Sequence, residues 1–213
     1  MILFTVPSSP FGARIRIQAA AKGLALTLAE PPGGLGSDEW RAVNPFGKVP
    51  VLRTDAGDII ESAVIQEYLE DMYPAPDLRG ADPFAVAGVR AFTRAVDLYL
   101  FPALFGLRGA AAGDASALAG AVAELETAVE RLARLTAPGA CLCGPSLSLA
   151  DCALVPARFY TDLFAARLGF VSPFARDAGF EAWWAHVTGL PPVAGVVADL
   201  ARIAAAPKAV RPA

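Results

Sequence analysis

Histidine and cysteine are scarce in this sequence, which limits the metal sites and disulfide frameworks that it can build. There is one histidine, His186, and the three cysteines all lie between positions 141 and 152. A structural zinc site needs four ligands, and an odd number of clustered cysteines does not complete a disulfide framework. We therefore expect no bound metal, and cysteines that stay reduced in the cytoplasm and pack as small apolar side chains.

Strong net charge and long apolar runs are also missing. Eighteen basic and 21 acidic side chains leave a formal charge of −3, which is too small to neutralise a row of phosphates or to bind an anionic membrane. No apolar run approaches the roughly 20 residues of a membrane span, and the short apolar start has no basic residues of a signal peptide before it. We expect neither nucleic acid nor membrane as a partner.

The first third of the chain alternates between strand and helix signals. Residues 2–6 are β-rich, residues 11–22 favour a helix, and residues 24–29 form a second apolar run, which together predict a β-α-β unit. Residues 51–60 have the pattern of strand, turn and strand. A helix is expected to follow directly from Ser62, because apolar residues then recur at helical spacing.

The rest of the chain shows only helical patterns. Residues 74–83 are rich in proline, aspartate and glycine, so we expect a linker over residues 77–83 between domains at 1–76 and 84–213. Alanine- and leucine-rich stretches at helical spacing then predict an all-helical second domain. The expected helices span residues 84–107, 115–135, 149–166 and 180–187, with a last helical stretch that follows Pro191-Pro192 and ends at residue 206.

Candidate ligand-binding residues first occur where the first strand meets the first helix, in the segment 8–11 (Ser-Ser-Pro-Phe). Ser9 is a good N-cap and Pro10 suits the first helical position. A helix N-terminus favours an anion, and a hydroxyl there can stabilise a thiolate, although serine cannot act as a base without a histidine partner. From these residues alone, a simple helix cap is the favoured interpretation.

Two further segments can hold a ligand. The segment 44–52 leads into a strand, and a cis bond between Val49 and Pro50 would turn the main chain of Val49 toward a ligand, with Lys48 as a nearby cation. Spacing alone favours the trans form. At the next strand end, Ser62 can cap a helix and hold a carboxylate while Glu61 takes an ammonium group, or the pair can be an ordinary capped helix start.

A fourth segment has a folding role. Ser148 and Asp151 have the spacing of a capping box, with Ser148 at the N-cap of a helix.

These four motifs, in this order, resemble those of the cytosolic glutathione S-transferase superfamily, and the resemblance runs along nearly the whole chain. Residues 9–11 resemble its serine or cysteine helix start, residues 44–50 its Asn-Pro-x-Gly-x-Val-Pro element with a cis-proline, residues 61–62 its Glu-Ser pair, and residues 148–151 its capping box. The resemblance implies an α/β thioredoxin-like N-terminal domain with the order β-α-β-α-β-β-α, followed by an all-α C-terminal domain.

The resemblance also implies roles for individual residues. The co-substrate would be glutathione, and Ser9 corresponds to the residue that activates its thiol. Its other binding residues would be Lys48, Val49, Pro50, Glu61 and Ser62.

Several aromatic side chains admit two interpretations. Trp40 can contact the ligand or pack in the core, and Tyr99, Phe101 and Phe105 can flank an electrophile pocket or pack in the core.

The implied activity is conjugation of the glutathione thiolate to a small apolar electrophile, as in detoxification, by a homodimer. Isomerisation, dehalogenation and disulfide reduction with glutathione stay open, and so does a non-catalytic binding protein of the same fold. Ser9 stands where thiol transferases of the family have cysteine, which argues against mixed-disulfide chemistry through a protein thiol. Zeta-like and omega-like features occur together, so the class is open.

Overall fold

The first part of the chain folds around a four-stranded mixed sheet. The structure is a computed structural model and describes residues 1–110, 115–136 and 140–206. The strand order is β2-β1-β3-β4, with β1 and β2 parallel and the other neighbours antiparallel. The strands are β1 (Ile2–Phe4), β2 (Thr27–Ala29), β3 (Val51–Thr54) and β4 (Gly57–Ile60). Strands β1 and β2 are therefore shorter than the sequence pattern predicted.

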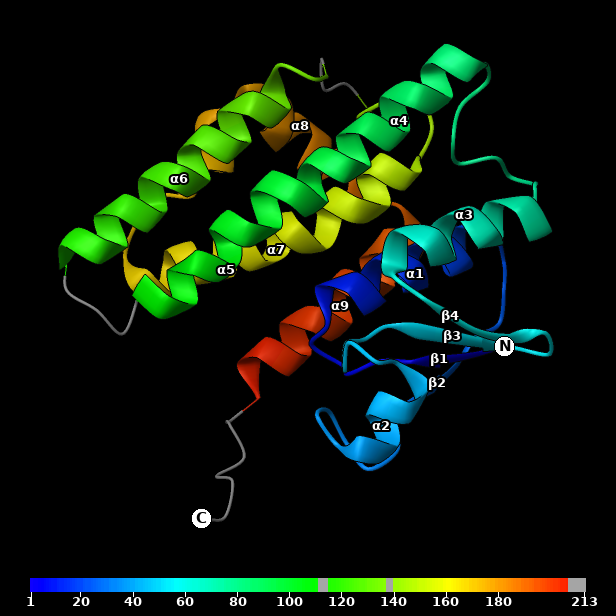
Figure 1. The fold of residues 1–213 in the computed structure, drawn as a ribbon. Coiled ribbons are helices and arrows are strands. Elements are labelled where there is room, and N and C mark those ends of the chain that lie inside the picture. The colour runs from blue at the N-terminus through cyan, green and yellow to red at the C-terminus, as the bar shows by residue number, and fades with distance from the viewer. Residues whose placement is uncertain (111–114, 137–139, 207–213) are drawn as a thin grey trace.

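Three helices cover the two faces of this sheet (Figure 1). Helices α1 (Pro10–Ala21) and α3 (Ser62–Met72) lie on one face, and α2 (Asp38–Val43) lies on the other. Because side chains alternate along a strand, Leu3 packs toward α1 and α3 while Phe4 packs against Trp40 of α2. This arrangement is the thioredoxin-like one that the resemblance implied.

The second part of the chain is helical, as predicted (Figure 1). The single helix expected over residues 84–107 is interrupted, because residues Val96–Leu100 form a π-helical segment, η1, between α4 and α5. A short 3-10 turn, η2 (Pro173–Arg176), precedes α8. The helices are α4 (Pro83–Ala95), α5 (Phe101–Ala110), α6 (Ala115–Ala133), α7 (Leu149–Leu168), α8 (Ala178–Val187) and α9 (Pro191–Ala205).

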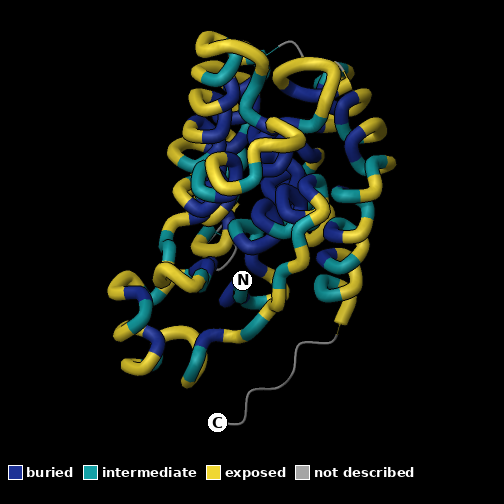
Figure 2. Tube along the Cα trace, turned by 90° about the vertical axis from the view of Figure 1, so that its right-hand side faces the viewer, coloured by how far each residue is buried: buried dark blue, intermediate teal, exposed yellow. Residues whose placement is uncertain are grey.

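Helix α7 is the centre of the helical part, and 13 of its 20 residues are buried. Figure 2 shows the buried segments gathered inside this part of the molecule. The predicted capping box is confirmed, since Asp151 accepts hydrogen bonds from the main-chain N–H and the hydroxyl of Ser148. Its second carboxylate oxygen accepts from the N–H of Leu142 and from the indole of Trp183. One buried carboxylate thus fixes α7, α8 and the segment before α7.

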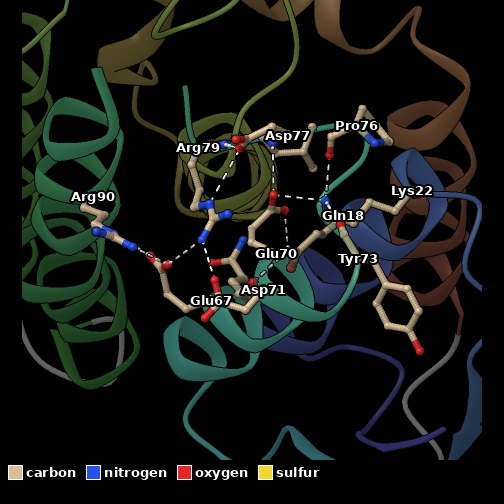
Figure 3. A network of polar contacts seen from close by, with 12 residues as sticks. Gln18, Lys22, Glu67, Glu70, Asp71, Tyr73, Pro76, Asp77, Arg79 and Arg90 are labelled. Atoms are coloured by element: carbon tan, nitrogen blue, oxygen red, sulfur yellow. Dashed lines mark hydrogen bonds and ion pairs between the residues drawn. The ribbon is translucent and has the colours of Figure 1, made fainter. Parts of the chain in front are cut away.

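A buried ion pair joins the end of α1 to α3, next to residues 73–78 (Figure 3). Lys22 and Glu70 lie 2.9 Å apart, and both side chains are fully buried. Lys22 also donates to the carbonyls of Tyr73 and Pro76, and Glu70 accepts from the main-chain N–H of Leu78. A buried charge without a partner is costly, and Lys22 and Glu70 find their partners in each other and in main-chain groups of residues 73–78. This pair therefore fixes the path of the chain from α3 into residues 73–78.

The same region has an outer layer of exposed ion pairs (Figure 3). Arg90 of α4 contacts Glu67 of α3 with two hydrogen bonds of 2.7 and 2.6 Å. Arg79 lies 2.6 Å from Asp71 and 4.0 Å from Glu67. These pairs bridge the two parts of the chain, but exposed pairs contribute little free energy each.

The helical part contains the three cysteines and the single histidine of the chain. Cys141 and Cys152 are buried, Cys143 is exposed, and all three are free. Trp183 is buried in the core, whereas His186 is exposed. None of the described helices is by itself long and apolar enough to cross a membrane, although α8 and α9 together reach that length and composition across a bend of 98°.

Replacing Lys22 by Met should lower the free energy of unfolding by about 3 to 5 kcal/mol, because the carboxylate of Glu70 is then buried without its cation. The double variant Lys22→Met/Glu70→Gln should recover part of this loss, since no unpaired charge remains. Urea unfolding measures both. The exposed pair gives the control: Arg90→Met should cost less than about 1 kcal/mol. Equal losses for Lys22→Met and Arg90→Met would contradict this account of the junction.

Candidate functional site

A cavity of about 640 Å³ lies where the two parts of the chain meet, and we call it the cis-proline cavity. Its walls come from the first turn of α1, the loop before β3, the start of α3, and the end of α4 with η1. Its volume is in the range of small-molecule sites. The lining residues are Phe11, Asn44, Lys48, Val49, Pro50, Glu61, Ser62, Ala63, Val64, Arg94, Asp97 and Leu98. Five of the six site residues predicted from the sequence are therefore brought together here.

The loop before β3 exposes main-chain hydrogen-bonding groups to the cavity. The Val49-Pro50 bond is cis, as the resemblance implied. Buried Asn44 holds the loop, because its side chain donates to the carbonyl of Lys48 at 2.9 Å and accepts from the N–H of Phe46 at 3.1 Å. Among the described residues, no hydrogen bond is made by the main chain of Val49 or by the ammonium group of Lys48. Both are free to contact a ligand.

The start of α3 also presents free N–H groups. The expectation that Ser62 caps this helix is wrong: Glu61 occupies the N-cap position, and its side chain makes no capping hydrogen bond. Only the N–H of Ile65 is bonded in the first turn, to the carbonyl of Glu61. The N–H groups of Ser62, Ala63 and Val64 have no partner in the described structure, and these three residues line the cavity. Such a helix start is suited to bind an anion.

Glu61 has an unusual backbone conformation, with φ at 67° and ψ at 115°. It is the one non-glycine residue with positive φ among those that the structure describes. A side chain in such a region costs about 1 to 3 kcal/mol, and such positions occur most often at functional sites. Its exposed carboxylate makes no ion pair with any described residue.

Two charged residues of the cavity region were not recognised in the sequence. Arg14 of α1 is fully buried and forms an ion pair of 2.6 Å with Asp97, which lines the cavity. Its other terminal nitrogen lies 3.4 Å from the hydroxyl of Ser62. Arg14 thus fixes one carboxylate and one hydroxyl at the edge of the cavity. The signal in the sequence is a charged residue between the apolar side chains of Ala13 and Ile15, but its partners are 48 and 83 positions away.

Ser9 is the predicted site residue that the cis-proline cavity does not include. It is the N-cap of α1, as predicted, and accepts a hydrogen bond of 3.1 Å from the N–H of Gly12. Its side chain lines a neighbouring cavity of about 400 Å³, which is also lined by Arg16 and Asp199. The hydroxyl proton of Ser9 has no acceptor among the described residues, so it can still be donated to a ligand.

The structure distinguishes between packing and ligand contact for the aromatic candidates. Trp40 is fully buried beneath the sheet, so its role is packing. The ring of Phe11 lies 4.5 Å from that of Phe101 and 6.2 Å from that of Phe105. Phe105 is 37% exposed and Tyr99 is 55% exposed. An aromatic cluster therefore extends from the cavity wall at Phe11 into the helical part.

A tyrosine of α7 connects the helical part to the segment before α1. The hydroxyl of Tyr160 donates to the carbonyl of Ser8 at 2.6 Å. Burial raises the pKa of Tyr160, and the positive charges of Arg108 and Arg167 partly offset this rise.

Within the described residues, no group of three or more His, Cys, Asp or Glu side chains is arranged to hold a metal ion.

A family model and several known proteins match this chain. Residues 3–77 match the family model of the glutathione S-transferase N-terminal domain. The chain is 30% identical over 175 residues to maleylacetoacetate isomerase of Mus musculus, an alignment that covers 76% of this chain and 81% of that protein. It is 36% identical over 108 residues to maleylacetoacetate isomerase of Pseudomonas aeruginosa, covering 48% of this chain.

A solved structure extends the similarity to the whole fold. A glutathione S-transferase from Methylobacterium radiotolerans, solved in complex with glutathione sulfonate, superimposes with a TM-score of 0.76 at 25% identity, covering 92% of this chain and 93% of that one. The sequence matches are shorter: the chain spans about half (51%) of the Pseudomonas isomerase that it matches.

The backbone at position 61 gives a test of strain at this site. Glu61→Gly should be more stable than Glu61→Ala by about 1 kcal/mol, because only glycine adopts this φ without a steric cost. Thermal or urea unfolding measures the difference. At Glu30, which is exposed and has no positive φ, the order should be reversed, since glycine there only adds entropy to the unfolded chain. Greater stability of the alanine variant at position 61 would show that the backbone there is unstrained.

Proposed function

Because this chain belongs to the glutathione S-transferase superfamily, we propose that its cis-proline cavity binds glutathione and that the chain transfers the glutathione sulfur to a small apolar electrophile. The observation that carries the proposal is the set of free hydrogen-bonding groups in the cavity: three N–H groups at the start of α3, the main chain of Val49, and the unpaired carboxylate of Glu61.

The γ-glutamyl end of glutathione is a zwitterion, with one carboxylate and one ammonium group. We assign its carboxylate to the free N–H groups and the hydroxyl at Ser62, where the helix dipole also favours an anion. Its ammonium group then lies near the carboxylates of Glu61 and Asp97, which line the same cavity. The Arg14 guanidinium keeps Asp97 and Ser62 in position through the contacts described above.

The rest of glutathione follows the loop before β3. The cysteinyl part pairs with the main-chain N–H and C=O of Val49, which lack other partners in the described structure. The glycyl carboxylate lies near the exposed ammonium of Lys48. Pro50 holds the cis bond that turns Val49 outward.

We assign thiolate stabilisation to Ser9. Its hydroxyl proton is available, and it lies at the positive end of α1. A hydrogen bond to the thiolate favours the charged form and so increases its fraction at neutral pH. The sulfur lone pair then forms a bond to an electrophilic carbon, and the leaving group departs with the electron pair of its own bond. Because Ser9 lines a second cavity, this assignment requires the glutathione sulfur to reach Ser9 from the cis-proline cavity.

Isomerisation is the second candidate reaction. It is favoured by the two relatives that are named maleylacetoacetate isomerase. The sulfur would add to a carbon of a double bond, the resulting single bond would rotate, and the sulfur would leave again, so that glutathione is regenerated. The two reactions are distinguished by the mass of the product, which contains glutathione only after conjugation.

Two expectations from the sequence stay predictions. One is the division into domains at residues 1–76 and 84–213 with a linker over 77–83. The other is the homodimer, for which the exposed side chains of Val64 and Phe84 offer apolar surface.

Isothermal titration with glutathione tests the binding site. Ser62→Ala and Glu61→Gln should each weaken binding at least about fivefold, because each removes one of the groups that contact a charged end of the ligand. The circular dichroism spectrum should not change. Glu67→Gln removes a charge from the same helix, but this residue contacts Arg90 outside the cavity, so its affinity should equal that of the wild type. Wild-type affinity in both site variants would refute the assignment.

The role of Ser9 is tested by the ultraviolet absorbance of bound thiolate as a function of pH. Ser9→Ala should raise the apparent pKa of glutathione in the complex, and each unit reduces the thiolate fraction at neutral pH about tenfold. Ser37→Ala is the matched control, because Ser37 caps α2 in the same way but lies outside both cavities. If the titration curves of wild type and Ser9→Ala superimpose, Ser9 is only a helix cap.

A further inference from the structure

Arg108, in the last turn of α5, is held between two aromatic rings at the surface. Its guanidinium carbon lies 5.6 Å from the ring centroid of Phe105 and 5.7 Å from that of Phe164. The residue is exposed, and it makes no ion pair and no hydrogen bond with any described residue. Two rings therefore restrict the guanidinium while its N–H groups stay available.

Two other arginines of this chain also contact two aromatic rings, and both form an ion pair with a carboxylate. Arg14 lies over the rings of Phe11 and Phe101, and it also pairs with Asp97. Arg158 lies over the rings of Phe174 and Trp184, and it also pairs with Asp162 and Glu181. Among the described residues, Arg108 is the one arginine placed between two rings without a carboxylate from the protein.

The position of Arg108 connects it to the cis-proline cavity. Phe105, which Arg108 contacts, lies 6.2 Å from Phe11, a residue of the cavity wall. On the other side, the charge of Arg108 acts on the hydroxyl of Tyr160, which is bonded to the carbonyl of Ser8. Arg108 is thus one aromatic side chain, Phe105, away from the cavity wall at Phe11.

The electrostatic surroundings favour an anion at this place. Arg167 acts on the same tyrosine hydroxyl as Arg108, so two positive charges lie near the segment at Ser8. A planar guanidinium offers two parallel N–H groups that match a carboxylate, and no described residue forms a hydrogen bond with those of Arg108. The same rings provide apolar and aromatic surface for the body of a ligand.

We propose that Arg108 binds a carboxylate of the second substrate, so that the electrophile of the proposed function has an apolar body that also carries a carboxylate, as in an unsaturated or aromatic carboxylic acid. This inference rests on the proposed function, since it places the acid beside bound glutathione. The reacting carbon would lie near the sulfur, the apolar body against Phe11 and Phe105, and the carboxylate at Arg108. Arg108 is then a residue that determines substrate specificity, separate from those that hold glutathione.

Matched pairs of glutathione conjugates test this proposal by isothermal titration. The first pair is S-(4-carboxybenzyl)glutathione and S-benzylglutathione, and the second is S-(3-carboxypropyl)glutathione and S-butylglutathione. The wild type should bind the acid of at least one pair about tenfold or more tightly, as expected for one charge-assisted contact. Arg108→Gln should remove this preference and leave the affinity for the neutral conjugate unchanged, whereas Arg108→Lys should keep part of it.

A distant arginine provides the control. Arg134 lies beyond the end of α6, is exposed and has no ion pair in the described structure, so Arg134→Gln removes the same charge without touching the aromatic cluster. Its preference for the acids should equal that of the wild type. Titration with glutathione alone separates the two proposals. Glutathione binding with no preference for the acid in either pair overturns the role of Arg108, and so does an equal loss of preference in Arg134→Gln. Failure to bind glutathione overturns the proposed function and this inference with it.

Discussion

A buried polar seam between α1 and α3 is the constraint on which the other parts of this structure depend. Three residues of or directly after α1 and three of α3, each set spaced by four positions, face one another along this seam. They are Arg14, Gln18 and Lys22 on one side and Ser62, Gln66 and Glu70 on the other. All six are buried, and Gln66 takes part through its main-chain carbonyl, which accepts from the side chain of Gln18. Separating the two helices would leave the polar and charged groups that are paired here without partners. The seam therefore fixes the relative position of α1 and α3.

The two ends of the seam serve different purposes. At the Lys22 end it fixes the path of the chain into residues 73–78 through the carbonyls of Tyr73 and Pro76. At the Arg14 end it extends into the helical part, because the guanidinium pairs with Asp97 of η1. The cavity wall is thus assembled from both parts of the chain by one buried cation. The guanidinium of Arg14 is fully buried, whereas the carboxylate of Asp97 is partly exposed and lines the cavity.

Main-chain groups supply much of the chemistry of the cis-proline cavity. The N–H groups at the start of α3 and the main chain of Val49 have no hydrogen-bond partner in the described structure, and their residues line the cavity. Backbone groups are held by the surrounding fold and lose little entropy when a ligand binds. The strained backbone at Glu61 lies at the same place, since this residue and the helix start after it line the cavity. Side chains of the helical part, such as Phe105 and Arg108, form the more variable surroundings.

The sequence by itself determined the elements whose signals are local. The Ser9 cap, the capping box at Ser148 and Asp151, and the helical second part depend on residues within one or two turns, and the structure confirms them. The resemblance to the superfamily also led to the cis bond before Pro50.

Only the tertiary structure decided which residues share a cavity. Ser62 proved to be the first residue of its helix and a partner of Arg14, Trp40 a packing residue, and Ser9 part of a neighbouring cavity. Arg14 and Asp97 are 83 positions apart, and no local pattern relates them. A cap or a helical period is fixed by neighbours in sequence, whereas the partner of a buried charge is fixed by how separate elements pack, which the order of residues along one element does not specify.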